Sequence, residues 1–247
     1  MNKIRTFLFA AIALFAAISC QEQIADPTPE NTEKEVMTIT ATVGAETKTV
    51  LGGDKGVSTF WLKNDKISVF DAKYGDNNRC FTVVEEGTEF PAQTATFACE
   101  EEFVLPADQT QEQALIVALY PYQEKAYCDF FDPADGKNVI TGLNMPAEQV
   151  AVVDNFDPLA TFTLATDKYT EKDNLLFNNI YTLLRSTLKE EGIKKVTVTM
   201  EGEDIAIAGD AHIVLNREIV EDSPVFNGGT FVATGTNVVT LTCEEGF

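Results

Sequence analysis

The residue whose type and position most clearly suggest chemistry is Cys20, a thiol placed directly after Ser19 at the end of an apolar run. Lys3 and Arg5 precede this run, which covers 7–18 and is too short for the ~20 residues that cross a bilayer as a helix. The pattern predicts a secretory signal peptide over 1–19, cleaved between Ser19 and Cys20, which leaves the thiol at the new N-terminus.

The segment 17–20 resembles the lipobox of bacterial lipoproteins, and this resemblance implies that Cys20 carries a lipid. The alternative is an ordinary signal peptide that is cut elsewhere and leaves Cys20 uninvolved. Each buried acyl methylene contributes ~0.8 kcal/mol, and more than one chain gives stable attachment. We therefore expect a soluble body tethered to a membrane surface through its N-terminus.

Other residues give little support for catalysis. His212 is the single histidine and lies in the apolar segment AHIVL, where a packed or hydrogen-bonded strand residue is the favoured interpretation. The acidic run 100–102 is typical of a solvated turn and not of paired glycosidase carboxylates. Because no nucleophile elbow, zinc-protease motif or phosphate loop is present, we expect no enzyme activity and no cofactor.

Metal sites are not expected either. Asp129, Asp132 and Asp135 could gather oxygen ligands for calcium, but their spacing departs from the usual calcium-loop pattern, so a plain turn is favoured. The sequence has no C-x-x-C motif and no Cys/His pairing of the kind that binds zinc.

Four cysteines remain once Cys20 is assigned to the lipid. Cys99 and Cys243 each share a face with apolar neighbours in alternating segments, so buried thiols are favoured there over disulfide bridges. For Cys80 and Cys128 the sequence leaves both states open.

Composition excludes some classes of partner and favours a packed core. The net charge of −21 repels nucleic acid and anionic lipid headgroups. A hydrophobic content of 45% with 17 phenylalanines indicates a folded body.

Trp61 lies between Phe60 and Leu62 and is expected in the core. Stacking of Trp61, Tyr120 and Tyr122 on sugars is the alternative.

Apolar and polar residues alternate in short segments along the chain. In 36–43, Met37, Ile39, Ala41 and Val43 share one face, which predicts a half-buried strand. Turn residues separate such segments every 8–12 residues, and no long helical pattern occurs, which predicts an all-β sandwich fold. The further expected strands are 48–51, 66–70, 79–84, 92–98, 114–120, a strand beginning at 139, 178–188 (with a short helix as its alternative), 194–200, 205–207 and 231–242.

Composition shifts suggest four parts. The signal peptide covers 1–19, and a polar tether rich in Pro, Glu and Thr covers 20–35. A first β-sandwich domain is expected over 36–163 and a second over 164–247, with a polar loop at 168–174.

Several short motifs follow the lipobox in succession: ETKTVL (46–51), WLKNDKISVF (61–70), ALYPY (118–122), LNMPAEQ (143–149), the segment 177–188 and IAIAG (205–209). This order resembles the fimbrillin-like lipoproteins of Bacteroidetes, the subunits of type V pili. The resemblance implies two tandem transthyretin-like β-sandwich domains, export to the outer membrane and no enzyme activity. Because members of this family usually continue further, the chain is expected to be either a partial product or a short variant with an incomplete second sandwich.

The resemblance also implies assembly by strand exchange after a protease cuts near the first strand. Between Arg5 and Arg79 the sequence has no arginine, so the basic residues near the first strand are Lys34, Lys48 and Lys55, and Lys48 and Lys55 are the candidate cleavage positions. Three alternatives stay open. A lysine-cutting protease acts there, the chain keeps its lipid as an anchor or adhesin, or these lysines are ordinary loop charges.

We therefore expect a lipid-modified (palmitate) surface protein of the outer membrane or fimbrium that serves as a structural, anchor or adhesive pilus subunit. Its expected partners are other pilus subunits through strand exchange, the membrane through the lipid, and ligands on host or bacterial surfaces. The alternative function is a glycan-binding lipoprotein for nutrient capture.

Overall fold

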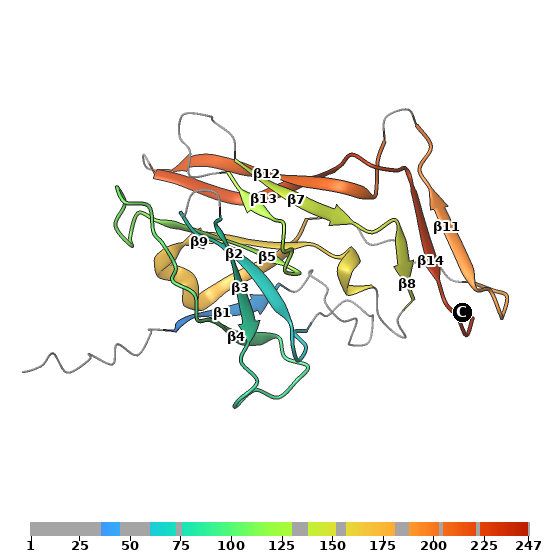
Figure 1. Cartoon of the computed structure of the whole chain (residues 1–247), viewed down its shortest axis with the longest axis horizontal. Helices are drawn as coiled ribbons and strands as arrows, with labels where there is room; N and C mark the ends of the chain where they lie inside the picture. Colours follow the sequence, from blue (N-terminus) through green and yellow to red (C-terminus); the bar gives the residue numbers. More distant parts are fainter. Residues whose placement is uncertain are drawn as a thin grey trace, which may run out of the picture. The chain divides into compact units, whose positions relative to one another are not determined.

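β-Strands make up nearly all the regular structure of the described residues (Figure 1). The computed structural model describes residues 36–44, 60–72, 76–129, 138–151, 157–180, 188–202, 205–220 and 223–246. Within them the helical segments are two short 3-10 helices, η1 (Pro158–Ala160) and η2 (Tyr169–Asn174). The all-β prediction is therefore confirmed. In this described part of the chain, no helix is long and apolar enough to span a membrane.

Seven strands close into a barrel in which each strand pairs with two neighbours. Six of the seven pairings are antiparallel, and the pairing of β1 with β10 is parallel. In order around the barrel the strands are β1 (Met37–Val43), β10 (Leu175–Asn179), β9 (Thr163–Lys168), β5 (Leu115–Tyr120), β2 (Lys66–Phe70), β3 (Asn78–Val83) and β4 (Thr94–Cys99).

Large aromatic side chains fill the barrel interior. Phe81, Phe97 and Phe177 come from three of its strands and are fully buried together with Trp61. Because successive side chains of a strand point to opposite faces, the alternation seen in the sequence sends one set inward. Fully burying a side chain of this kind contributes ~1.5–3 kcal/mol, so this core is a main source of stability.

A second core lies against the outer face of β2, β5 and β9. It is covered by a four-stranded antiparallel sheet in which the long hairpin of β12 (Gly209–Val220) and β13 (Ser223–Ala233) joins β7 (Val139–Met145) and β6 (Tyr127–Cys128). Figure 1 shows β12, β13 and β7 running side by side. A separate three-stranded sheet contains β11 (Lys195–Thr199), β14 (Val238–Thr242) and β8 (Glu148–Val150).

β5 belongs to both cores. Ile116 and Ala118 face the barrel interior, whereas Val117 and Leu119 pack in the second core, and all four are fully buried. A strand buried on both faces has no polar face to present. This explains why the sequence shows an unbroken apolar run at 114–120.

A kink in β7 depends on Gly142. Its φ is +73°, and a Cβ atom built there would lie 1.9 Å from the carbonyl oxygen of Lys125. At this point Thr141 and Gly142 of β7 both lie opposite one residue of β12, His212, which is a β-bulge. The glycine lets the chain before β6 lie directly against β7, because no side chain intervenes.

Most of the testable strand predictions are confirmed. The segments 36–43, 66–70, 79–84, 92–98, 114–120 and 194–200 correspond to β1, β2, β3, β4, β5 and β11 within about two residues, and the strand expected from 139 is β7. In β1 the predicted alternation is confirmed, since Ile39, Ala41 and Val43 are buried, although Met37 on the same face is half-buried.

Three local predictions were wrong. The segment 205–207 is not a strand, because Ala208 forms an isolated bridge to Thr236 and β12 begins at Gly209, whose φ of +100° breaks the extended run before it. The segment 231–242 is not one strand: β13 ends at Ala233 and pairs with β12, whereas β14 begins at Val238 and pairs with β11 and β8. The expected loop at 168–174 contains the last residue of β9 and then η2.

The division into domains at 163/164 stays a prediction. In the structure β9 begins at Thr163 and pairs with β5 and β10, so described strands on both sides of this point share one sheet. The expected strand 48–51, most of the expected strand 178–188, the signal peptide and the tether to residue 35 lie outside the described residues.

Candidate functional site

β1 is the strand that closes the barrel and the first strand of the described chain. On one side it pairs antiparallel with β4 over six residues, from Met37↔Cys99 to Thr42↔Thr94. On the other side it pairs parallel with β10 over three residues, from Ala41↔Leu175 to Val43↔Phe177. β1 is thus fully paired along β4 and only partly paired along β10.

The inner face of β1 completes the barrel core. Ile39 and Ala41 are fully buried and Val43 is nearly so. Trp61 lies inside the barrel and donates a hydrogen bond of 2.9 Å from Nε1 to the carbonyl oxygen of Ala41. Its indole makes edge-to-face contacts with Phe97, Tyr120 and Phe177 at centroid distances of 5.0, 5.4 and 5.2 Å.

Polar contacts hold the two ends of β1. The hydroxyls of Thr42 and Thr94 are 2.9 Å apart, and the amide of Gly44 donates to the carbonyl oxygen of Phe177 at 3.0 Å. At the other end the Tyr169 hydroxyl of η2 lies 4.0 Å from the sulfur of Met37. Met37 is only partly buried, so this end of β1 is less enclosed than its middle.

If β1 left, the barrel would open between β4 and β10. Their backbone groups would lose their partners, and an apolar groove floored by Trp61 and Phe97 would be exposed. An extended segment with an apolar residue at every second position can fill such a groove, since it supplies both backbone hydrogen bonds and side chains. We name this feature the β1 groove.

A half-buried carboxyl supports the floor of the β1 groove. Asp65 accepts hydrogen bonds from the Leu62 amide at 2.7 Å and from the Tyr120 hydroxyl at 3.2 Å. Burial raises the pKa of Asp65 to about 6, although the hydrogen bonds from Leu62 and Tyr120 act in the opposite direction. No sequence pattern pointed to this role, because an aspartate next to Asn64 is typical of an ordinary turn.

The predicted site residues fall in two groups. Ser19, Cys20, Lys48 and Lys55 lie outside the described residues. Trp61 is 0% and Tyr120 3% exposed, so the interpretation of Trp61 as a core residue is confirmed and neither ring can stack on a sugar. Tyr122 is half-buried.

The structure describes His212 but not two of the aspartates considered as calcium ligands, Asp132 and Asp135. His212 is half-buried in β12 opposite Val232 of β13. Asp132 and Asp135 lie outside the described residues. Within the part of the chain that is described, no group of three or more His, Cys, Asp or Glu side chains could hold a metal ion.

The four described cysteines, Cys80, Cys99, Cys128 and Cys243, form no disulfide with one another. Cys99 is a buried core thiol as predicted, and burial raises the pKa of its thiol. Cys243 was expected in the core but is half-buried, because it follows the end of β14, where its thiol donates to the carbonyl oxygen of Gly246 at 3.1 Å. Of the two cysteines left open, Cys128 is buried and Cys80 half-buried.

The sequence interpretation missed a buried ion pair. Arg79 is 3% exposed and donates from Nε to Asp71 Oδ2 at 2.8 Å. The Asp71 carboxylate also accepts from the Val104 amide at 3.2 Å. One signal was available, because the predicted alternation puts Arg79 on the same face as Phe81 and Val83.

No protein-family model, curated protein or solved structure matches the chain.

Proposed function

We propose that this protein is a lipid-anchored surface subunit of the fimbrillin-like type, with Cys20 as its lipidated residue. It serves as a structural, anchor or adhesive pilus component built from tandem transthyretin-like sandwiches, and it joins other subunits by β-strand complementation. The observation that carries the proposal is the position of β1, an N-terminal strand that closes a barrel and covers an aromatic groove.

The energetics of β1 support exchange for another strand. Its two buried β-branched residues, Ile39 and Val43, each contribute ~1.5–3 kcal/mol when fully buried. Its backbone also satisfies hydrogen-bonding groups of β4 and β10. A donor segment with the same alternation would bury the same kind of apolar side chains and form the same backbone hydrogen bonds. The free energies of the two bound states can therefore be nearly equal, and subunit concentration would drive the exchange.

The order of features along the chain supports control by proteolysis. Cys20 and β1 both precede Lys48 and Lys55, whereas the other barrel strands follow them. One cut at either lysine would separate the lipid and β1 together from the rest of the barrel. β1 would then be held by non-covalent contacts alone, and an uncut chain would stay at the membrane as an anchor.

The glycan-binding alternative receives less support. It requires aromatic rings on an accessible face, but Trp61 and Tyr120 are buried inside the barrel. Among the aromatic residues proposed to stack on sugars, only Tyr122 reaches the surface.

The test uses the full chain with a site-specific protease sequence inserted between residues 45 and 59. After cleavage, we expect a labelled peptide of residues 36–44 to displace β1 and to co-elute with the barrel in a 1:1 complex. The control peptide exchanges Ile39 with Thr40 and Ala41 with Thr42, which keeps the composition but moves two of the apolar residues from the inward face to the outward face.

Trp61 provides the second readout, because it is the single tryptophan of the chain. Its emission should shift to the red when β1 leaves and return when the peptide binds. Equal binding of both peptides, or an unchanged emission after β1 has been removed, contradicts strand complementation at the β1 groove.

A further inference from the structure

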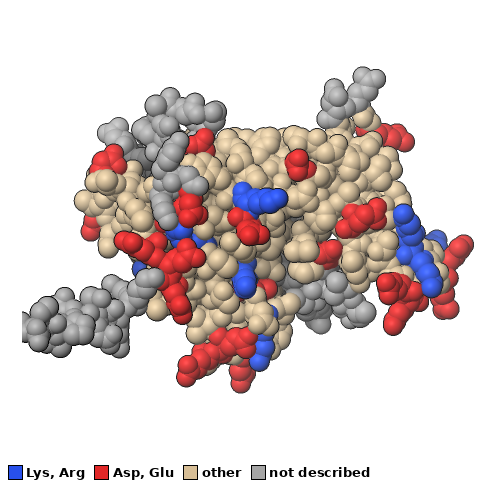
Figure 2. Space-filling view, viewed as in Figure 1, with Lys and Arg blue, Asp and Glu red and all other residues tan. Residues whose placement is uncertain are grey.

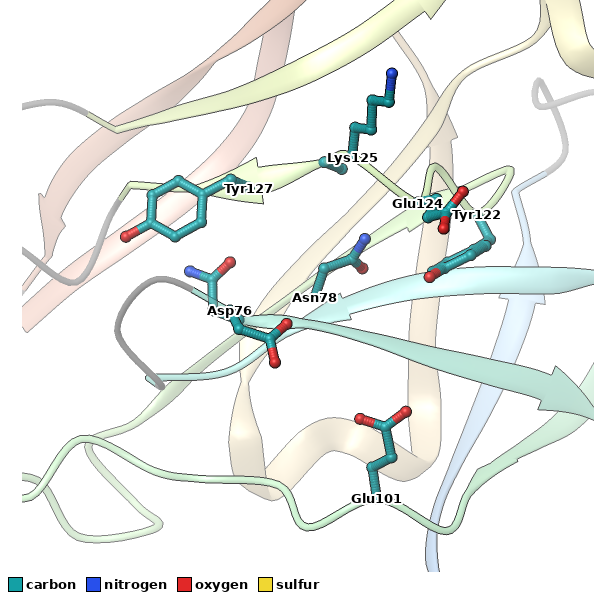
Figure 3. Close-up of a pocket in the computed structure, with 9 residues that line it drawn as sticks. Asp76, Asn78, Glu101, Tyr122, Glu124, Lys125 and Tyr127 are labelled. Atoms are coloured by element: carbon teal, nitrogen blue, oxygen red, sulfur yellow. The ribbon is translucent and has the colours of Figure 1, made fainter.

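A polar pocket of about 420 Å³ lies away from the β1 groove, between the start of β3, the residues after β4 and the segment that leads into β6 (Figure 3). We name it the β3–β6 pocket. The side chains that give it its chemical character are Asp76, Asn78, Glu101, Tyr122, Glu124 and Tyr127.

Two asparagines fix the walls of the β3–β6 pocket. Asn77 is buried, donates from Nδ2 to the carbonyl oxygen of Cys128 at 2.6 Å and accepts from the Cys128 amide at 3.2 Å. Asn78 donates from Nδ2 to the carbonyl oxygen of Gln123 at 2.7 Å. These bonds tie the start of β3 to β6 and to the segment before it, so the pocket is formed without a ligand.

The β3–β6 pocket carries excess negative charge. Beneath it Arg79 contacts Glu101 Oε2 at 3.2 Å and Asp76 Oδ2 at 3.6 Å, in addition to the buried Asp71. One guanidinium therefore faces three carboxylates, and Glu124 adds a fourth. Lys125 also lines the pocket, but Figure 3 shows its ammonium pointing away from Asp76 and Glu101.

The wall of the pocket also holds a hydrogen-bond acceptor that has no donor. Asn78 Oδ1 is buried without a partner. Figure 3 shows the Asn78 amide directed toward Tyr122. Burial raises the pKa of Tyr122, with further contributions from Cys80, Glu124, Glu101 and Asp76. A buried acceptor that lacks a donor costs free energy, so a small rotation of the Asn78 amide that opens this oxygen to a donating group is favoured.

From these features we propose that the β3–β6 pocket binds an organic cation through a primary ammonium group, either a free amine or a lysine side chain of a partner protein. The ammonium donates to carboxylate and amide oxygens, and the rings of Tyr122 and Tyr127 contact its alkyl chain. Amine binding in this pocket does not depend on strand exchange.

Two other ligand classes fit less well. A metal ion needs several oxygen ligands within about 2.6 Å, and the described carboxylates do not converge in that way. A neutral polyol would leave the excess negative charge uncompensated. The net charge of −21, and the many carboxylates on the face shown in Figure 2, also attract a cation over longer distances.

The test measures binding to the full chain by isothermal titration calorimetry at low ionic strength. We expect saturable 1:1 binding of cadaverine as the free amine or of Nα-acetyl-lysine amide as the protein-borne amine, and the tighter ligand identifies the source. Neither 1,5-pentanediol nor Ca²⁺ should bind in a saturable way.

Variants locate the site. Glu101→Gln and Glu124→Gln should each weaken amine binding about five- to tenfold, because each removes one charge-assisted hydrogen bond. Glu102→Gln is the matched control: the residue is exposed and lies outside the pocket lining, so binding should stay within about twofold. Equal weakening by all three variants, binding of the diol as tight as that of the amine, or no saturable amine binding overturns the proposal.

Discussion

The indole nitrogen of Trp61 lies 2.9 Å from the carbonyl oxygen of Ala41, and this hydrogen bond connects the barrel interior to the strand that closes it. Both residues are fully buried. The bond therefore forms away from water. If the indole were removed, no water molecule could take its place as donor to the Ala41 carbonyl oxygen. One side chain thus serves as floor of the β1 groove and as a direct attachment for β1.

Replacing Trp61 with Phe should lower the free energy of unfolding by ~2–4 kcal/mol. The change leaves the Ala41 carbonyl oxygen without its donor and leaves a cavity among Phe97, Tyr120 and Phe177. Urea denaturation followed by circular dichroism measures the loss. The control is Phe103→Leu, which alters a partly buried ring at the edge of the same core and should cost ~1 kcal/mol. A smaller loss for Trp61→Phe than for Phe103→Leu contradicts the assigned role of Trp61.

Asp65 should make the stability of the chain depend on pH in a defined window. Its pKa in the folded chain is about 6, above the ordinary value of 3.8, so the folded state binds this proton more tightly than the unfolded state does. The resulting stabilisation is complete below about pH 4 and is lost as the pH rises through about 6, and it amounts to ~3 kcal/mol at most.

Asp65→Asn tests this window. Asparagine can accept from the Leu62 amide and donate to the Tyr120 hydroxyl, so both contacts can remain. Measured by urea denaturation between pH 4 and pH 7, the wild-type chain should lose stability relative to the variant. Parallel pH profiles for the two proteins contradict the prediction.

Removing one partner of the Arg79–Asp71 pair should be costly. Arg79→Met leaves a buried carboxylate uncompensated and should lower the free energy of unfolding by ~3–5 kcal/mol. The double variant Arg79→Met/Asp71→Leu should lose less than the sum of the two single variants. As the control, Lys63→Met breaks an exposed 3.7 Å pair with Glu85 and should cost less than ~1 kcal/mol. Additive losses in the double variant would show that the pair has no coupling.

Two glycines with nearly the same positive φ allow a matched comparison. Gly142 has φ +73°, and a Cβ atom added to it would lie 1.9 Å from a backbone oxygen, whereas Gly87 has φ +78° and would place its Cβ with no atom within 4 Å. Gly87→Ala should cost only the ~1–2 kcal/mol of the left-handed conformation. Gly142→Ala should cost clearly more, because β7 and Lys125 must move apart. Equal melting temperatures for both variants contradict the close contact.

The proposed lipid attachment can be tested at one residue. Cys20→Ala should abolish incorporation of labelled palmitate in a bacterial host that processes lipoproteins, because no other thiol would become N-terminal. Cys80→Ala is the control and should leave labelling unchanged. Labelling that persists in Cys20→Ala refutes the anchor.

The sequence predicted those parts of the fold that depend on local alternation. In β1 and β4 one set of alternate side chains is buried, so the alternation in the sequence agrees with the observed strands. The apolar run at 114–120 predicted a strand but not its position between two cores, because period and composition do not say what covers each face.

Other features depend on contacts between residues far apart in sequence. The parallel pairing of β1 with β10 joins segments more than 130 residues apart, and no local pattern encodes it. The β3–β6 pocket combines residues from 76 to 127 in the same way. The position of Arg79 on an apolar face was visible in the sequence, but its partner Asp71 lies at the end of β2 and could not be paired with it by spacing alone.

β5 gives one set of side chains to each core, and this has a consequence for dissecting the chain into fragments. A fragment that ends before β5 would lack a wall of the barrel, and one that begins after it would expose the apolar side of the β12–β13 hairpin. We therefore expect neither half to fold when expressed alone, and we expect the intact body to melt in a single transition.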